Sequence, residues 1–211
     1  MNHRLITLIT LFLIICTAQA TDYHVGPGQS LSAIADVDWT ALQAGDNVFI
    51  HWRSTPYREK WVINVQGTAQ NPISIIGVSG PNGDQPVIDG ENAVTVAGLN
   101  FWNEPRGLIK IGGSNVPSDG LPQHIIIENL DIRSAYKDYQ FTNDQGQTET
   151  YSNNAAAIYV EKAAHLTIRN CSLSNSYRIF LFFIRIHLNS KLISQYMKLI
   201  YCGRSIDVTS Y

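Results

Sequence analysis

The phrase HIIIENLDIRS, residues 124–134, is followed further along the chain by a similar phrase, HLTIRNCSLSN, residues 165–175. Each phrase holds two short runs in which apolar and polar residues alternate, and an asparagine separates the runs. A period of two is typical of β-strands that bury one face. The two phrases therefore predict two equivalent pairs of strands, one stacked on the other.

Similar segments precede both phrases. GLIKIGGS (107–114) stands before the first, AAIYVEKA (156–163) stands before the second, and WVINVQG (61–67) with ISIIG (73–77) gives the same rhythm upstream. Turn residues punctuate these runs, and no helical periodicity lies between them. The pattern predicts an all-β solenoid, in which each coil buries its inner face against its neighbours.

The alternation also predicts orientation. Asn129 and Asn170 fall at the corner between the paired runs, where asparagine tolerates a left-handed backbone and stacked amides can bond from coil to coil. Glu128 and Arg169 occupy equivalent outward positions, which favours a structural ion pair over a catalytic one. The predicted inward side chains are Ile125, Ile127, Leu130 and Ile132, then Leu166, Ile168, Cys171 and Leu173.

The chain begins with a segment of a different kind. Residues 1–20 carry Arg4, then an apolar run, then Ala18-Gln19-Ala20, which predicts a signal peptide with a small-x-small cleavage site. The apolar run is shorter than the ~20 residues that span a bilayer. We therefore expect no stable membrane insertion after cleavage, and a product that is secreted, periplasmic or at the cell surface.

Residues 177–211 form an atypical tail, in which the strand–turn rhythm stops and the charge balance changes from acidic to basic. A helix that caps the solenoid is one interpretation, because solenoids need their open ends covered. The interpretation we favour is a chain that is truncated or translated out of frame at this point. Such a chain would lack later coils of the solenoid.

Composition excludes several classes of function. The formal net charge of −2 in 211 residues supplies no clustered basic surface, so nucleic acid is not an expected partner. No CxxC or HExxH pattern occurs, so a zinc site is not expected. Cys171 and Cys202 could form at most one disulfide after signal cleavage. A monomer with one elongated domain is the simplest expectation.

GLIKIGG…HIIIENLDI and AAIYVEKAAHLTIRNCSL resemble coils of the right-handed parallel β-helix proteins, the pectate-lyase-like superfamily. Residues 21–46 are similar to the N-terminal cap of these proteins, which implies a short helix over the open end, and residues 47–176 would form the coils. The apolar face of that helix would come from Leu31, Ile34, Trp39 and Leu42.

The resemblance is to secreted polysaccharide lyases, which implies β-elimination on an acidic, uronate-containing glycan. In such enzymes Ca²⁺ neutralises the uronate carboxylate and a lysine or arginine removes the C5 proton. Acidic, basic and aromatic residues gather after the first phrase and in the loop 135–154. The roles implied are Arg133 and Lys137 as candidate bases, Asp131 and Asp138 as Ca²⁺ ligands, and Tyr136, Tyr139 and Trp102 as sugar-binding residues.

Two alternatives remain at this point. The residues of this group could be solvated surface residues, with the aromatic rings holding the loop to the wall of the solenoid. The protein could accordingly be a noncatalytic surface or carbohydrate-binding solenoid rather than an enzyme, since one fold hosts many activities.

Overall fold

The structure is a computed structural model that describes residues 19–176, 178–182, 184–188, 191–195 and 206–208. Nearly all regular structure in this part of the chain is β-strand. The helical residues described are two three-residue 3-10 turns, η1 (Ile34–Asp36) and η2 (Glu104–Arg106). Within the same residues, no helix has the length and apolar character to cross a membrane. The predicted signal peptide falls almost wholly outside the described residues, as does much of the tail.

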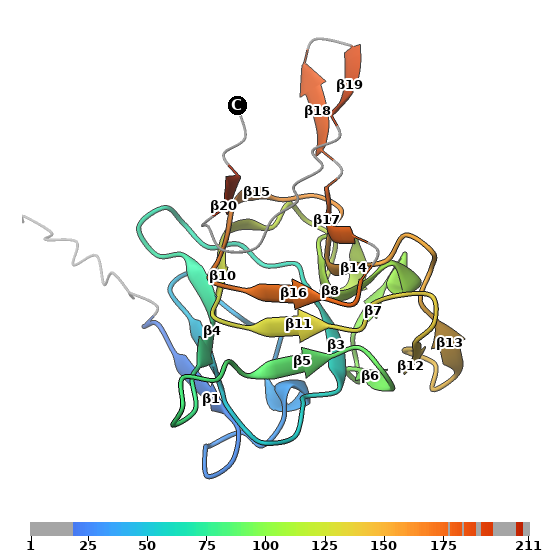
Figure 1. Ribbon diagram of the computed structural model, residues 1–211. Coiled ribbons are helices and arrows are strands. Elements are labelled where there is room, and N and C mark those ends of the chain that lie inside the picture. Colours follow the sequence, from blue (N-terminus) through green and yellow to red (C-terminus); the bar gives the residue numbers. More distant parts are fainter. Residues whose placement is uncertain (1–18, 177, 183, 189–190, 196–205, 209–211) are drawn as a thin grey trace, which may run out of the picture.

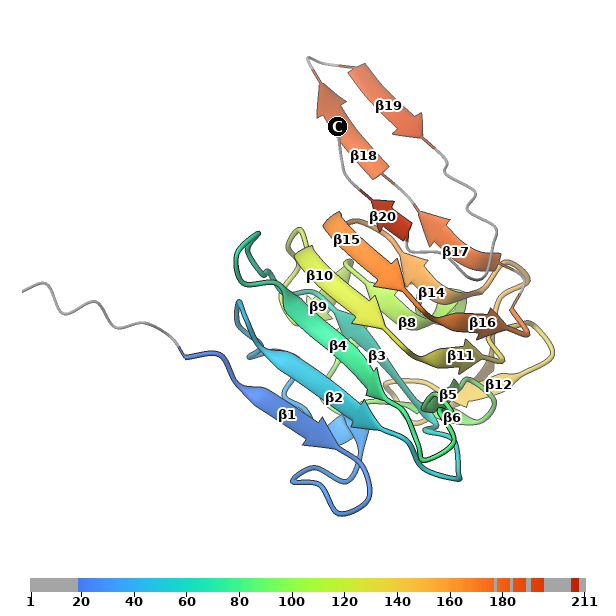
Figure 2. The same ribbon diagram turned by 60° about the vertical axis from the view of Figure 1, so that its left-hand side comes forward.

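The first sheet stacks parallel strands from end to end of the molecule, as Figure 2 shows. At its far end the short strand β20 (Ile206–Val208) pairs with the last parallel strand in the antiparallel sense. The parallel strands, in spatial order, are β1 (Asp22–Val25), β2 (Asn47–His51), β4 (Ile73–Val78), β10 (Gln123–Glu128) and β15 (Ala164–Arg169).

The second sheet is smaller and also parallel. Its strands are β5 (Val87–Asp89), β11 (Asp131–Arg133) and β16 (Ser172–Ser174), which lie one above another at the front of Figure 1. β11 and β16 follow a strand of the first sheet after a two-residue corner, and β5 follows β4 after the longer segment 79–86.

From each strand of the second sheet the chain continues to the third sheet. Its parallel strands, in spatial order, are β12 (Gln140–Thr142), β6 (Ala93–Thr95), β3 (Glu59–Ile63), β8 (Gly107–Ile111), β14 (Ala156–Val160) and β17 (Arg178–Phe182). The strand β13 (Thr148–Thr150) folds back antiparallel on β12. The remaining pairs are antiparallel: β7 (Asn100–Phe101) with β9 (Ser114–Val116), and β18 (Ile184–Leu188) with β19 (Lys191–Gln195).

The two similar phrases lie side by side in the register that the sequence predicts. Ile125 pairs with Leu166, and Asp131 pairs with Ser172. Of the eight predicted inward residues of the two phrases, the six other than Cys171 and Leu173 are at most 5% exposed. Cys171 and Leu173 are partly buried and pack against the same core. The predicted inward face is therefore confirmed, with its last two members less deeply buried.

The predicted asparagine corner is confirmed. Asn129 and Asn170 have φ values of 58° and 50°, in the left-handed region. The amide Nδ2 of Asn170 donates to Oδ1 of Asn129 at 2.8 Å, and Nδ2 of Asn129 donates to the Gly77 carbonyl at 2.7 Å. At Gly77 the backbones approach so closely that a Cβ atom would lie 1.8 Å from the Asn129 carbonyl oxygen. The equivalent outward residues Glu128 and Arg169 form the expected ion pair.

The expected helix in the N-terminal segment is wrong, although its apolar contacts are right. Ile34, Trp39 and Leu42 are buried, and the Trp39 ring stacks on Trp61 with centroids 5.3 Å apart. The indole Nε1 of Trp39 donates to the Ile34 carbonyl at 3.0 Å. The segment thus covers the end of the core as an irregular chain that contains only η1. Leu31 is partly buried against the same core.

Two aspartates explain why no longer helix forms there. One Asp36 carboxylate oxygen accepts the backbone N–H groups of Ser32 and Ala33, both at 2.9 Å. Asp38 accepts the backbone N–H of Thr40 at 3.0 Å. Such local side-chain bonds stabilise turns and compete with a helical ladder.

Candidate functional site

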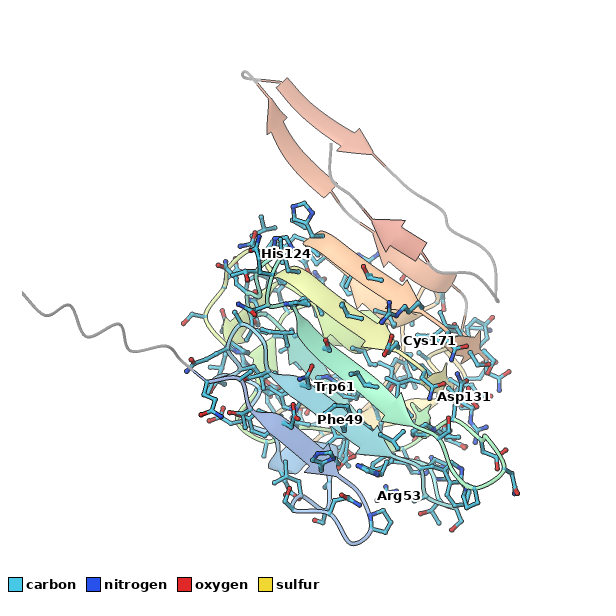
Figure 3. The ribbon with its side chains drawn as sticks, turned by 90° about the vertical axis from the view of Figure 1, so that its left-hand side faces the viewer. Phe49, Arg53, Trp61, His124, Asp131 and Cys171 are labelled. Carbon is cyan, nitrogen blue, oxygen red and sulfur yellow. The ribbon has the colours of Figure 1, made fainter. Side chains whose placement is uncertain are left out.

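The candidate site lies where the chain leaves the second sheet. Ser134 follows β11 with φ 61°, and Asn175 follows β16 with φ 48°. Because Arg133 pairs with Ser174, these two corner residues lie on neighbouring layers. Asp131 and Cys171, labelled in Figure 3, mark the other corner, where the chain enters the second sheet from the end of the first sheet opposite His124.

An open cleft of about 380 Å³ lies at this corner. It contains three of the residues that the sequence predicts for the site, two of them aromatic. Its lining residues are Tyr136, Asp138, Tyr139, Asn175 and Ser176. Two phenol rings, a carboxylate and small polar groups therefore share one concave surface.

The segment 135–154 is more ordered than the predicted loop, because it contains the β12–β13 hairpin. The Tyr139 N–H donates to the Tyr136 carbonyl at 2.8 Å, and the Tyr151 N–H donates to the Tyr139 carbonyl at 3.2 Å. The Tyr151 side chain is 2% exposed, and its hydroxyl donates to the Gly90 carbonyl at 3.1 Å. The cleft tyrosines thus rest on a segment that is anchored in the core.

Lys137 lies at the rim of the cleft, between two lining residues. Its Nζ is 3.7 Å from the Asp138 carboxylate and 5.7 Å from the centre of the Tyr136 ring. The Lys137 and Asp138 side chains are 49% and 69% exposed. Such an exposed pair holds its partners weakly, so the Lys137 amine is accessible to solvent, although Lys137 is not itself part of the cleft lining.

Asp131 and Arg133 belong to a different group of side chains, on the outer face of the second sheet. The Arg133 guanidinium lies 3.3 Å from Asp89 and 3.8 Å from Asp131. Arg58 lies 3.8 Å from Asp89 on the other side. Burial raises the pKa of Asp131, Arg133 opposes this shift, and the nearby Asp89 adds to it. None of these four residues is part of the cleft lining.

Trp102 also lies apart from the cleft lining, beyond the end of β7. Its side chain is 38% exposed, and its Nε1 donates to the Glu161 carboxylate at 2.6 Å. Asn103 Nδ2 donates to the same carboxylate at 3.2 Å, and Lys110 Nζ lies 3.0 Å from it. Glu161 therefore fixes the indole in one orientation on the outer side of the third sheet.

The predicted calcium ligands are not brought together as a coordination shell. Asp131 pairs with Arg133, and Asp138 pairs with Lys137. Ca²⁺ takes six to eight oxygen ligands, commonly from several carboxylates. In the part of the chain that the structure describes, no group of three or more His, Cys, Asp or Glu side chains could hold a metal ion. The donor set around these two aspartates does not fit calcium, and we assign no step to it.

Sequence reasoning missed Asn175 and Ser176 in the cleft, and Asp89 beside Arg133. A signal for Asp89 exists, because PVIDG (86–90) can be aligned with LDIRS (130–134). This alignment is the observed one, since Val87 pairs with Asp131 and Asp89 pairs with Arg133. Asn175 could have been found from its equivalence to Ser134, the corner residue of the other phrase.

Comparison of the chain with protein-family models, with curated proteins and with solved structures found no significant match. The function is therefore argued from the geometry of the cleft and its surroundings.

Proposed function

We propose that this protein is a secreted right-handed parallel β-helix that acts on polysaccharide at the cleft of Tyr136 and Tyr139. Parallel strands that return in turn to three sheets support the fold assignment, and so does the column of asparagine amides at one corner. Right-handed crossovers are the rule for parallel strands in one sheet. The resemblance of the two phrases to pectate-lyase-like coils supports the same assignment.

The observation that carries the proposal is the composition of the cleft lining. Tyr136 and Tyr139 offer aromatic faces with polar tips, which suit the apolar faces and hydroxyl edges of sugar rings. Asp138, Asn175 and Ser176 add acceptors and donors on the same surface. Because the cleft is open, it suits a segment of a long polymer better than a small enclosed ligand. Glycan binding is the function that this geometry supports best.

Cleavage by β-elimination is the second candidate, and the position of Lys137 favours it. Lys137 lies between Tyr136 and Asp138, so its amine is at the rim of the cleft where a bound uronate would lie. A lysine in this position can remove the C5 proton as a general base. Arg133 is the weaker candidate, because Asp89 and Asp131 already bind its guanidinium.

A binding experiment tests the first candidate. The purified protein is titrated against pectate, alginate and a neutral glucan, with Tyr136→Ala as the test variant and Trp102→Ala as the matched aromatic control. Loss of one stacking ring should weaken binding by roughly tenfold in Tyr136→Ala. Equal affinity of Tyr136→Ala and the parent, for every glycan that the parent binds, would exclude the cleft as the binding site.

An absorbance assay separates cleavage from binding alone, because elimination creates a conjugated double bond. If Lys137 is the base, uronate polymers give a rising ultraviolet absorbance that Lys137→Met abolishes while binding is retained. Lys162→Met is the control, since Lys162 pairs with Asp119 away from the cleft lining. Binding without any rise in absorbance would leave the noncatalytic function and eliminate the lyase.

A further inference from the structure

Lys60 is a fully buried lysine that no part of the proposed function uses. It lies in β3, beside the core residue Trp61, and its side chain points to the opposite face of the strand. Its Nζ donates to the Glu104 carbonyl at 2.8 Å and also to the Gly107 carbonyl. These carbonyls belong to η2 and to the first residue of β8, so the ammonium holds the segment between β7 and β8 against the third sheet.

Aromatic rings from the segment 135–154 surround the same ammonium. The Lys60 Nζ is 4.4 Å from the centre of the Phe141 ring and 5.0 Å from that of Tyr151. A third ring, Phe101 of β7, is 5.8 Å away. The Phe141 and Tyr151 rings also contact each other, with centroids 4.8 Å apart. In the protonated form of Lys60, cation–π attraction adds to the hydrogen bonds and offsets part of the cost of burying the charge.

A direct chain of contacts joins Lys60 to the cleft. The Tyr151 ring faces the ammonium, and the Tyr151 N–H donates to the carbonyl of Tyr139, which lines the cleft. Tyr139 in turn donates its N–H to the carbonyl of Tyr136. A movement of Tyr151 away from Lys60 would consequently displace both cleft tyrosines.

We propose that Lys60 is a positioning residue for the cleft: its amino group packs against Phe141 and Tyr151 and holds the segment 135–154 on the third sheet, and opening of this segment releases the amine to water. The proposal rests on the proposed function only for what the cleft binds. The coupling between Lys60 and the shape of the cleft depends only on the contacts of Lys60, Tyr151 and Tyr139.

Opening of the segment 135–154 takes up a proton. Burial lowers the pKa of Lys60 to about 7, Glu104 opposes the shift, Lys110 adds to it, and Glu149 also opposes it. In the open state the amine meets water and regains its ordinary pKa of 10.5. The open state therefore binds the proton more tightly, so a rise in pH from about 7 towards 10.5 favours the closed state. The ratio of closed to open molecules changes by at most ~10-fold per pH unit.

Three other titratable groups lie near Lys60: Glu104, Tyr151 and Lys110. Burial raises the pKa of Glu104 above its ordinary 4.5, so its protonation favours the closed state towards acid pH. Burial raises the pKa of Tyr151 well above 10.0. Burial also lowers the pKa of Lys110, which bonds to the Trp102 and Gly113 carbonyls outside the segment 135–154. We therefore expect the proton at Lys60 to set the direction of the pH dependence of opening between pH 7 and pH 9.

Tryptic cleavage after Lys137 measures the opening in the full chain without any glycan. Lys137 lies in the segment 135–154, and its side chain is 49% exposed. The cleavage rate is measured at steps from pH 7 to pH 9 and divided by the rate for a free peptide of the same local sequence. The parent should show a normalised rate that falls by several-fold per pH unit. A flat profile in the parent would overturn the proposal.

The variant Lys60→Met removes the titrating group and keeps a long side chain. Its normalised rate should not change with pH, whereas the control Lys110→Met should keep the parent's slope. Lys110 is a matched buried lysine of the same sheet, and its Nζ hydrogen-bonds to the Trp102 and Gly113 carbonyls, outside the segment 135–154. A slope in Lys60→Met equal to that of the parent, or its loss in both variants, would contradict the role of Lys60.

A further variant keeps the proposal testable if Lys60→Met does not fold, as judged by circular dichroism. Phe141→Leu retains Lys60 but removes the ring nearest to its amino group, and the lost packing of this buried ring should raise the cleavage rate after Lys137 several-fold at every pH. An unchanged rate in Phe141→Leu would refute the aromatic part of the coupling. Because no glycan takes part, failure of the binding experiment above would leave these outcomes unaffected, and the reverse also holds.

Discussion

The asparagine corner and the covered side of the third sheet both join neighbouring chain segments through polar side chains, but in different ways. At the corner, Asn129 and Asn170 use identical side chains on neighbouring layers, and each amide bonds to the layer below. On the third sheet, Lys60 and Lys110 bind backbone carbonyls of the segments that cover them. The corner is neutral and local to its layers, whereas the covered side places charge between segments that are distant in sequence.

This difference indicates which part of the molecule can respond to pH. A neutral amide column has no titratable group, so its stability should not depend on pH between pH 5 and pH 9. A buried amine has a protonation state that the surrounding segments set, and it sets their position in return. We therefore expect the corner to act as a frame that does not respond to pH, and the covered side to be the part that does.

The largest expected effect tests the frame. Ile127→Asp places a charge between Ile75 and Ile168, the residues with which Ile127 pairs in the first sheet. An unpaired buried charge should lower the free energy of unfolding by about 4 kcal/mol or more, measured by urea denaturation. Ile126→Asp, on the outward face of the same strand, is the control and should cost far less. Similar losses in both variants would mean that the inward register is wrong.

Gly77→Ala tests the close approach at the corner. The new Cβ would meet the Asn129 carbonyl oxygen at 1.8 Å, so the backbones must separate at a cost of about 3 kcal/mol. Gly83→Ala is the control, because a Cβ there has no neighbour within 4 Å and only its φ of +83° is unfavourable. That control should lose about 1 kcal/mol. Equal melting curves for the two variants would argue against the close contact.

Two substitutions of Asn129 separate its amide from its backbone conformation. Asn129→Ala loses the amide bonds and strains a residue with φ 58°, which should cost about 2 kcal/mol. Asn129→Gly loses the same bonds without the strain and should cost about 1 kcal/mol. Thermal and urea melts at pH 6 and pH 8 should give the same differences. A pH dependence of either difference would contradict the expectation that the corner, unlike the buried lysines, does not respond to pH.

The smallest expected effect concerns the exposed pair of Glu128 and Arg169. Glu128→Gln should lower the free energy of unfolding by about 0.2 to 1 kcal/mol at low salt and by less at high salt, because water and ions screen the pair. Arg169 is 48% exposed, which supports this low value. A double-mutant cycle with Arg169→Gln measures it. A coupling above 2 kcal/mol would show that this pair, too, belongs to the frame.

The sequence predicted those parts of the molecule in which one layer repeats the residue pattern of the layer next to it. The inward isoleucines, the asparagine corner and the pair of Glu128 with Arg169 all follow from the alignment of two phrases, because parallel strands place equivalent residues side by side. The prediction of a cap helix was wrong because Asp36 bonds to the backbone N–H groups near it and favours a turn. A hydrophobic pattern alone does not show that such side-chain bonds compete with a helix.

The site was predicted only where its residues are contiguous. Tyr136, Asp138 and Tyr139 line one cleft because a single turn carries them. Asp131 and Arg133 are near in sequence but belong to β11, so they face Asp89 of the neighbouring strand instead. The importance of Lys60 depends on Glu104, Phe141 and Tyr151, which no local pattern connects to it. Contacts of this kind arise only when the chain has folded over the third sheet.

The amide column has a direction, and this direction bears on how the chain can assemble. The Asn170 amide donates to Asn129, and the Asn129 amide donates to the Gly77 carbonyl, so each of these two bonds runs from a later residue to an earlier one. During synthesis the acceptor therefore leaves the ribosome before its donor. Each new layer can be added onto a finished surface that already presents the oxygen it needs, and no earlier bond has to break when the next layer arrives.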